Sequence, residues 1–87
     1  MNQSSLKQGL KDWTDFDGAA FQLAVSLGLM NADTSLVKAK HVFWSTNAIG
    51  TMLYNILTLL TERGILEYRD EPDHQYRWNS NFKGTWE

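Results

Sequence analysis

The chain has 87 residues, of which 43% are hydrophobic and 13% aromatic; it has no cysteine, and its formal net charge is −2. These values predict one globular domain with a modest core and exclude a disordered chain, a disulfide framework and a thiolate metal site. The net charge also argues against strong autonomous binding to nucleic acid, because phosphate neutralisation supplies most of the affinity of such binding.

Residues 1–12 are predicted to be a flexible N-terminal segment because most of them are polar. Leu6, Leu10 and Trp13 have the spacing of one amphipathic turn, but Gly9 lowers the helix propensity there. The segment lacks the apolar stretch of a signal peptide, and no part of the chain approaches the roughly 20 apolar residues of a membrane helix. We therefore expect a cytoplasmic protein that does not bind membranes, and the absence of cysteine fits a reducing cytosol.

A first helix is predicted over residues 15–27. Thr14 is followed three residues later by Asp17, which resembles a capping box with aspartate in place of the usual glutamate. One apolar stripe then follows at helical spacing, made by Phe16, Ala20, Leu23, Ala24 and Leu27. Gly28 is suited to the left-handed residue that often ends a helix.

A second helix is predicted over residues 34–43, with Asp33 as its N-cap. The side chains expected to face the core are Leu36, Ala39 and Phe43. Lys38 and Lys40 are the only charges between residues 34 and 46, so this stretch carries a local positive charge.

The third helix, predicted over residues 47–63, has the clearest pattern. At about 100° per residue, one arc is apolar and consists of Ile49, Met52, Leu53, Ile56, Leu57, Leu59 and Leu60. The opposite arc consists of Asn47, Gly50, Thr51, Tyr54, Asn55, Thr58, Thr61 and Glu62. Gly64 is expected to end the helix, with Ile65 as the hydrophobic residue that follows it.

A β-hairpin is predicted next. The expected register places Leu66 opposite Trp78, Glu67 opposite Arg77, Tyr68 opposite Tyr76 and Arg69 opposite Gln75. This register puts the apolar side chains on one face and forms an opposite-charge pair on the other. It leaves Glu71, Pro72 and Asp73 as the loop, and Leu66, Tyr68, Tyr76 and Trp78 are expected to face inward.

The order helix, helix, short turn, helix and two-stranded hairpin resembles the winged helix-turn-helix family, and the stretch LLTERGILEYRDEPDHQYRW carries the resemblance most closely. The resemblance implies an α+β domain of three helices and a C-terminal hairpin at residues 13–80, followed by a tail at 81–87. By that resemblance, helix 47–63 is a recognition helix. The side chains that would contact a nucleic acid or another partner are then Asn47, Thr51, Tyr54, Asn55 and Thr58.

The charges near this face depart from what DNA binding requires. The residues that would contact phosphate from the flanks are Lys38, Lys40, Arg69 and Arg77. However, the exposed arc of helix 47–63 has no lysine or arginine, and the tip of the hairpin carries Asp70, Glu71 and Asp73. The function that the resemblance implies is a non-enzymatic winged-helix module that uses helix 47–63 for nucleic-acid binding or transcription regulation, with weak binding of duplex DNA expected from these charges.

The alternative is a protein-interaction module that uses the same helix face without binding DNA. Protein interfaces are depleted in lysine and glutamate and enriched in tyrosine, which matches this uncharged arc. A homodimer is compatible with both functions, and the residues expected at its contact are Tyr54, Trp13 and Trp86. Trp44 and Trp78 are instead expected in the core or at its edge.

The sequence contains no catalytic motif. It lacks G-x-S-x-G, a phosphate-binding loop, a cysteine nucleophile and H-E-x-x-H. His41 and His74 are the only histidines, and neither has carboxylates at ligand spacing, so no metal site is expected. We expect no enzymatic activity, no cofactor and no small-molecule substrate.

Overall fold

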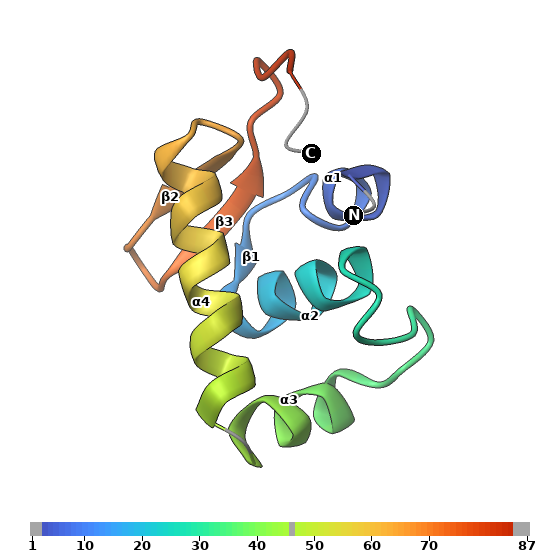
Figure 1. Ribbon diagram of the computed structural model, residues 1–87. Coiled ribbons are helices and arrows are strands. Elements are labelled where there is room, and N and C mark those ends of the chain that lie inside the picture. The colour runs from blue at the N-terminus through green and yellow to red at the C-terminus, as the bar shows by residue number, and fades with distance from the viewer. Residues whose placement is uncertain (1–2, 46, 85–87) are drawn as a thin grey trace.

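The computed structural model describes residues 3–45 and 47–84, which form four helices and one three-stranded antiparallel sheet, an α+β arrangement (Figure 1). In chain order the elements are α1 (Gln3–Gly9), β1 (Thr14–Asp15), α2 (Phe16–Ser26), α3 (Leu36–Ser45), α4 (Asn47–Glu62), β2 (Leu66–Arg69) and β3 (Gln75–Trp78). The helices predicted over residues 15–27, 34–43 and 47–63 correspond to α2, α3 and α4, with ends that differ by at most two residues.

The sheet has the strand order β1-β3-β2. All four predicted cross-strand pairs of the β2–β3 hairpin are confirmed, from Leu66 opposite Trp78 to Arg69 opposite Gln75. Strand β1 was not predicted, because two residues are too few to show an alternating pattern. It pairs with β3 and thereby places the start of α2 beside the hairpin.

The hairpin differs from the prediction at its tip. The loop between the strands spans residues 70–74 rather than 71–73. Tyr68 was expected to face inward, but 41% of it is exposed. It lies at the far end of β2, where its ring stacks on His74 and packs against Tyr76 instead of entering the core.

The N-terminal segment also differs from the expected flexible stretch. Residues 3–9 form α1, and both Leu6 and Leu10 are fully buried. The Leu10 carbonyl accepts a hydrogen bond of 2.7 Å from the Trp78 amide, which ties this segment to β3. Gly9 allows a close approach to α2, since a Cβ at this position would overlap the Gln22 side chain. Tertiary contacts therefore stabilise a helix too short to be stable alone.

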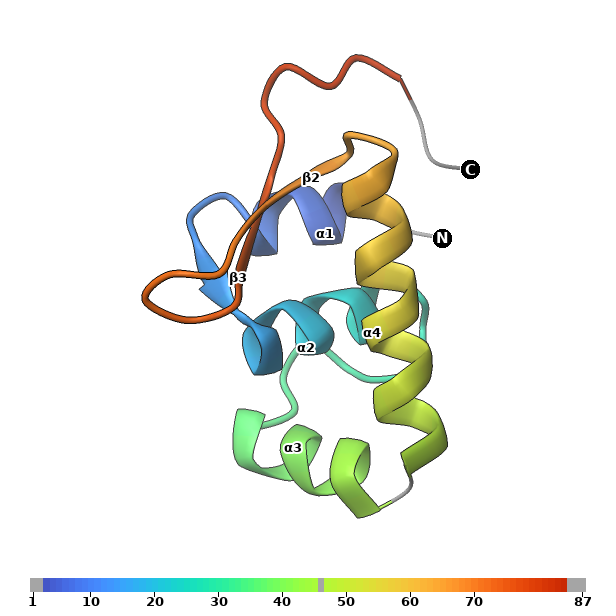
Figure 2. The ribbon, with the colours of Figure 1, turned by 90° about the vertical axis from the view of Figure 1, so that its left-hand side faces the viewer.

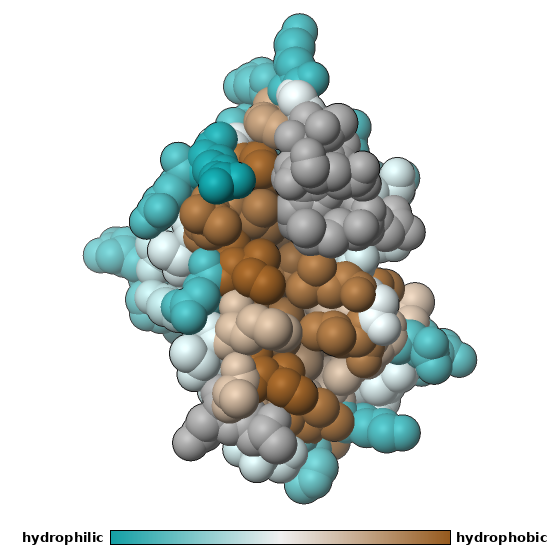
Figure 3. Space-filling view, in the orientation of Figure 1, coloured by the Kyte–Doolittle hydropathy of each residue, from teal (hydrophilic) through white to brown (hydrophobic). Residues whose placement is uncertain are grey.

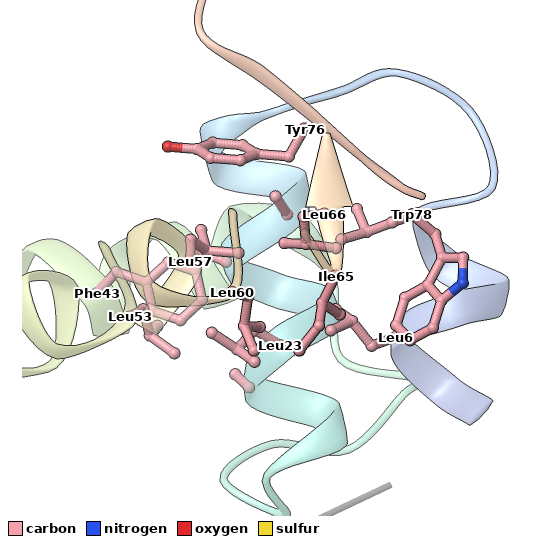
Figure 4. Packing of buried hydrophobic residues seen from close by; sticks show 14 of the residues in the cluster. Leu6, Leu23, Phe43, Leu53, Leu57, Leu60, Ile65, Leu66, Tyr76 and Trp78 are labelled. Atoms are coloured by element: carbon pink, nitrogen blue, oxygen red, sulfur yellow. The ribbon is translucent and has the colours of Figure 1, made fainter. Parts of the chain in front are cut away.

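The hydrophobic core lies between the four helices and one face of the hairpin, with Ala39 and Phe43 contributed by α3 (Figures 2 and 4). Its largest fully buried side chains are Leu6, Leu10, Leu23, Phe43, Leu53, Leu57 and Leu66. Leu66, Tyr76 and Trp78 cover the core from the hairpin, as predicted, and all three are at most 7% exposed.

Two glycines end helices as predicted. Gly28 and Gly64 both have φ of +76°, which residues with a Cβ rarely adopt. After α4, the Gly64 and Ile65 amides donate to the Thr61 and Leu60 carbonyls, the paired bonds of a Schellman motif. The side-chain amide of Asn79 donates to the Gly64 carbonyl at 2.8 Å, so the end of β3 also holds this turn.

Two predicted helix starts are corrected. The cap of α2 is Asp15, whose carboxylate accepts a hydrogen bond from the Gly18 amide at 2.9 Å, rather than Thr14 with Asp17. Thr14 belongs to β1, so the helix begins one residue later. In α3, the Ser35 hydroxyl, rather than Asp33, accepts from the Lys38 amide at 3.3 Å.

Candidate interaction surface

Helix α4 has two apolar stripes rather than one. The first consists of Leu53, Leu57 and Leu60, which are at most 5% exposed and pack into the core. The second, which we call the α4 seam, consists of Ile49, Met52, Ile56 and Leu59; of these, Ile49 and Ile56 are half-buried and also pack against the core. Met52 and Leu59 belong to the predicted apolar arc, but they are 39% and 43% exposed. The single apolar arc is too wide for one packing partner, so part of it remains on the surface.

Hydrophobic surface covers α4 on the face of the domain seen in Figure 1, as the brown band in Figure 3 shows. Within the described residues, the large hydrophobic side chains that are most exposed on α4 are Met52, Tyr54 and Leu59. Leu36, predicted to be buried, is 43% exposed in α3, and Val37 beside it is 79% exposed. Only Ala39 and Phe43 of the predicted inward face of α3 are buried.

The predicted contact residues lie on the side of α4 that faces away from the core. Thr51, Tyr54 and Asn55 are exposed, and Thr58 is half-buried. The side chain of Asn47 lies outside the described part of the structure, as does Trp86. At about 100° per residue, Thr51 and Asn55 form a ridge between the seam and the side of α4 that carries Tyr54.

A groove runs between this second side of α4 and the hairpin. It consists of two neighbouring recesses of about 380 and 190 Å³ that share Tyr54 and Tyr76 in their linings, and we call it the α4–hairpin groove. The larger recess is lined by Phe16, Trp44, Gly50, Thr51, Tyr54, His74 and Tyr76. The smaller one continues along Thr58, Thr61, Glu62 and Tyr68.

Aromatic rings form most of this groove. The ring centroid of Phe16 lies 5.9 Å from that of Trp44 and 6.0 Å from that of Tyr54. Trp44 was expected in the core or at its edge, but it is 55% exposed. Gly50 lets α4 pass close to Trp44, because a Cβ on residue 50 would lie 3.3 Å from the Trp44 ring and 3.1 Å from the Phe43 carbonyl oxygen.

The two arginines expected to contact phosphate are occupied on the other face of the sheet. The guanidinium groups of Arg69 and Arg77 lie 4.4 and 4.5 Å from the centroid of the Trp13 ring. Arg77 also forms a salt bridge of 3.1 Å with Glu67, and Arg69 donates a hydrogen bond of 2.6 Å to Gln75. Sequence reasoning missed this role of Trp13, because the contact joins residues more than 50 positions apart.

The two candidate lysines have different surroundings. Lys40 forms a salt bridge of 3.2 Å with Asp17 at the start of α2. Lys38 is exposed and forms no ion pair within residues 3–45 and 47–84. Of the four predicted phosphate contacts, Lys38 alone thus has no salt bridge, side-chain hydrogen bond or aromatic partner in the described part of the chain.

Tyr76 connects the groove to the core. It is 3% exposed, and its hydroxyl points away from the other labelled core side chains in Figure 4. Burial, followed by the nearby Tyr68 and Tyr54, raises the pKa of Tyr76 from 10.0 to about 12. The phenol is therefore held in its neutral form by the fold.

We expect this pKa shift to make folding stability fall at alkaline pH. Above pH 10 the unfolded chain releases the Tyr76 proton while the folded chain retains it, so the unfolded state gains stability until the folded pKa of about 12 is passed. The loss is at most about 3 kcal/mol at about 1.4 kcal/mol per pKa unit. Urea unfolding between pH 9 and pH 12 measures it. Tyr76→Phe should remove this part of the pH dependence; an unchanged profile would contradict the assignment.

The described residues also limit other kinds of site. No group of three His, Asp or Glu side chains suited to a metal ion occurs in residues 3–45 and 47–84. None of the helices in that part of the chain is long and apolar enough to cross a membrane. His41 is exposed, and the ring of His74 is hydrogen-bonded to the Tyr68 hydroxyl.

We compared the chain with protein-family models, with curated proteins and with solved structures, and none of them matches it. The surface chemistry of α4 and the hairpin is therefore the basis on which a function is assigned.

Proposed function

We propose that this chain is a winged-helix-like protein-interaction module that contacts its partner through the α4 seam. The winged-helix-like arrangement is supported by the order of α2, α3 and α4, followed by the β2–β3 hairpin. The interaction function is supported by the exposed apolar side chains of α4 and by the absence of charge from Asn47 to Thr61.

The α4 seam is the single observation that carries this proposal. Ile49, Met52, Ile56 and Leu59 follow each other at intervals of three, four and three residues, the spacing with which one helix packs along another in a coiled coil. Met52 and Leu59, which lie about two turns apart on the helix, remain about two-fifths exposed in the isolated domain. A second helix laid along the seam would remove them from water.

The partner that we propose for the seam is the same seam of a second copy. A twofold interface brings identical patches together, so it requires a patch without like charges that would repel. The seam meets this requirement because its four residues are all apolar. A four-turn helix pair covers less than the roughly 800 Å² per partner of a standard interface, so the dimer should be weak, with a Kd on the order of 10–1000 µM.

Sedimentation equilibrium over a concentration range of about 5 µM to about 1 mM tests this proposal. We expect the wild-type chain to pass from monomer to dimer within that range. Leu59→Glu and Met52→Glu should each keep it monomeric, because a dimer would bury an unpaired carboxylate. Both positions are well exposed in the monomer, so the variants should still fold.

Val37→Glu is the matched control, since it makes the same change in charge at a 79% exposed position on α3. It should dimerise like the wild type. A wild-type chain that stays monomeric up to about 1 mM, or an equal loss of dimer in the Val37 variant, would refute self-association through the seam.

Binding to duplex DNA is the second candidate function. The element order and the exposed Thr51 and Asn55 on α4 favour it, because these side chain types contact base edges in helix-turn-helix proteins. The occupied arginines and the acidic hairpin tip weigh against it.

An amide NMR titration with a random-sequence duplex at about 20 mM salt separates the two functions. Salt-sensitive shifts on Lys38 and residues 47–58 would support DNA binding, whereas we expect none.

A further inference from the structure

The α4–hairpin groove is a second surface of the domain, on the other side of the Thr51–Asn55 ridge from the seam. Its larger recess presents the rings of Phe16, Trp44 and Tyr54 to solvent or to an occupant. Tyr76 belongs to the core, whereas Trp44 and Tyr54 are each more than half exposed. The recess therefore leaves parts of these rings exposed, although Trp44 and Tyr54 also pack on Phe16.

The charges around the groove have one sign. Glu62 is the one charged side chain lining it within the described residues, and it lies at the end away from Trp44. The hairpin tip beside His74 adds the exposed carboxylates of Asp70, Glu71 and Asp73. Burial, and then the nearby carboxylate of Asp70, raises the pKa of Tyr68, which lines the smaller recess.

Three of the basic residues have partners outside the groove. Arg69 and Arg77 are directed to Trp13 on the opposite face of the sheet. Lys40, from α3, is paired with Asp17. An anionic occupant such as nucleic acid would meet carboxylates in the groove, whereas a cationic occupant would meet both carboxylates and aromatic faces.

The chain shows this type of contact elsewhere in its own fold. The Trp13 ring lies within 4.5 Å of two guanidinium groups, an arrangement in which the ring quadrupole attracts the planar cation. Arginine is more suited to it than lysine because its guanidinium stacks on rings and is less strongly hydrated. The groove has the aromatic component of such a contact but no cation of its own among the described residues.

We propose that the α4–hairpin groove binds an arginine-bearing linear segment of a partner protein, with one guanidinium over the Trp44 and Tyr54 rings and a second basic group near Glu62. This inference rests on the proposed function in one respect, because it takes the chain to be a protein-binding domain. It does not depend on the α4 seam, which lies on another side of the helix.

The probe is the peptide acetyl-Gly-Arg-Leu-Arg-Gly-amide. Its control is the same peptide with citrulline at both arginine positions, because citrulline is neutral and nearly isosteric with arginine. In an NMR titration at low salt we expect at least about tenfold tighter binding of the arginine peptide. The indole N–H signal of Trp44 should move, and that of Trp13 should not, because Trp13 lies on the opposite face of the sheet. Trp→Phe variants assign the two signals.

Three variants locate the site. Tyr54→Ala removes a half-exposed ring and should weaken arginine-peptide binding by about tenfold. Glu62→Gln should reduce it by a few-fold, with a smaller effect at high salt. Leu29→Ala, a truncation at a 53% exposed position that belongs to neither the groove nor the seam, is the control and should leave the Kd unchanged.

Equal binding of the arginine and citrulline peptides, no binding of either, or shifts that avoid the groove would overturn the inference. Tighter binding of a single-stranded oligonucleotide at Trp44 and Tyr54 would also overturn it, since bases stack on exposed rings too. Repeating the titration with Leu59→Glu separates the two proposals. If this variant no longer self-associates but still binds the peptide, both proposals are supported. If the wild-type chain stays monomeric but binds the peptide, self-association through the seam is refuted and the groove proposal stands.

Discussion

Replacing Leu6 by alanine is expected to lower the free energy of unfolding by about 2–5 kcal/mol, the range for large-to-small changes in a packed core. Leu6 is fully buried and belongs to the same cluster as Leu23, Ile65 and Trp78. A domain of this size has a total stability of roughly 4–13 kcal/mol, so the loss is a large share of it. The midpoint temperature should fall by about 10–30 °C.

Urea unfolding followed by circular dichroism measures this loss, and Gln8→Ala is the control. Gln8 is an exposed residue of the same short helix, so its replacement should change stability by less than about 0.5 kcal/mol. If residues 1–12 were a flexible segment, as the sequence alone predicts, both variants would be neutral. A neutral Leu6→Ala variant would therefore show that α1 does not contribute to the core.

Leu57 and Leu59 should respond very differently to the same substitution, although the sequence places both on one apolar arc of the helix. Leu57 is fully buried in the first apolar stripe of α4, whereas 43% of Leu59 is exposed in the seam. Leu57→Ala should cost about 2–5 kcal/mol because it leaves a cavity. Leu59→Ala should cost less than about 1 kcal/mol at a protein concentration where the chain is monomeric, because little buried surface is lost.

Urea unfolding of both variants at about 1 µM gives the comparison, since a dimer with a Kd of about 10 µM or weaker is then mostly dissociated. The two residues have the same helix propensity and the same chemistry, so each is the matched control of the other. Similar losses for both would mean that the seam is buried in the monomer. That result would remove the basis for proposing a partner helix there.

The hairpin shows how far local patterning reaches. Its register followed from alternating side chains, one opposite-charge pair and a turn containing proline, all within fifteen residues. Its inward face was predicted correctly except at Tyr68, which lies beyond the end of the core. Alternation reveals which face a side chain shares, but not whether another element covers that part of the face.

The candidate site was predictable only in part. The exposure of Thr51, Tyr54 and Asn55 followed from the helical period of α4, because polar residues recur on one side of it. The groove was not predictable, since Phe16, Trp44 and Tyr76 come from three distant segments. The engagement of Arg69 and Arg77 by Trp13 was missed for the same reason.

The sequence by itself determined the elements whose signals are local: three helices with two glycine ends, and a hairpin with its register. These depend on backbone conformation and on side-chain periods of a few residues. Only the tertiary structure decided the folding of α1, the pairing of β1 and the exposure of Met52 and Leu59. Each of these depends on which distant surface covers an apolar side chain, and burial of that kind is a property of the whole chain.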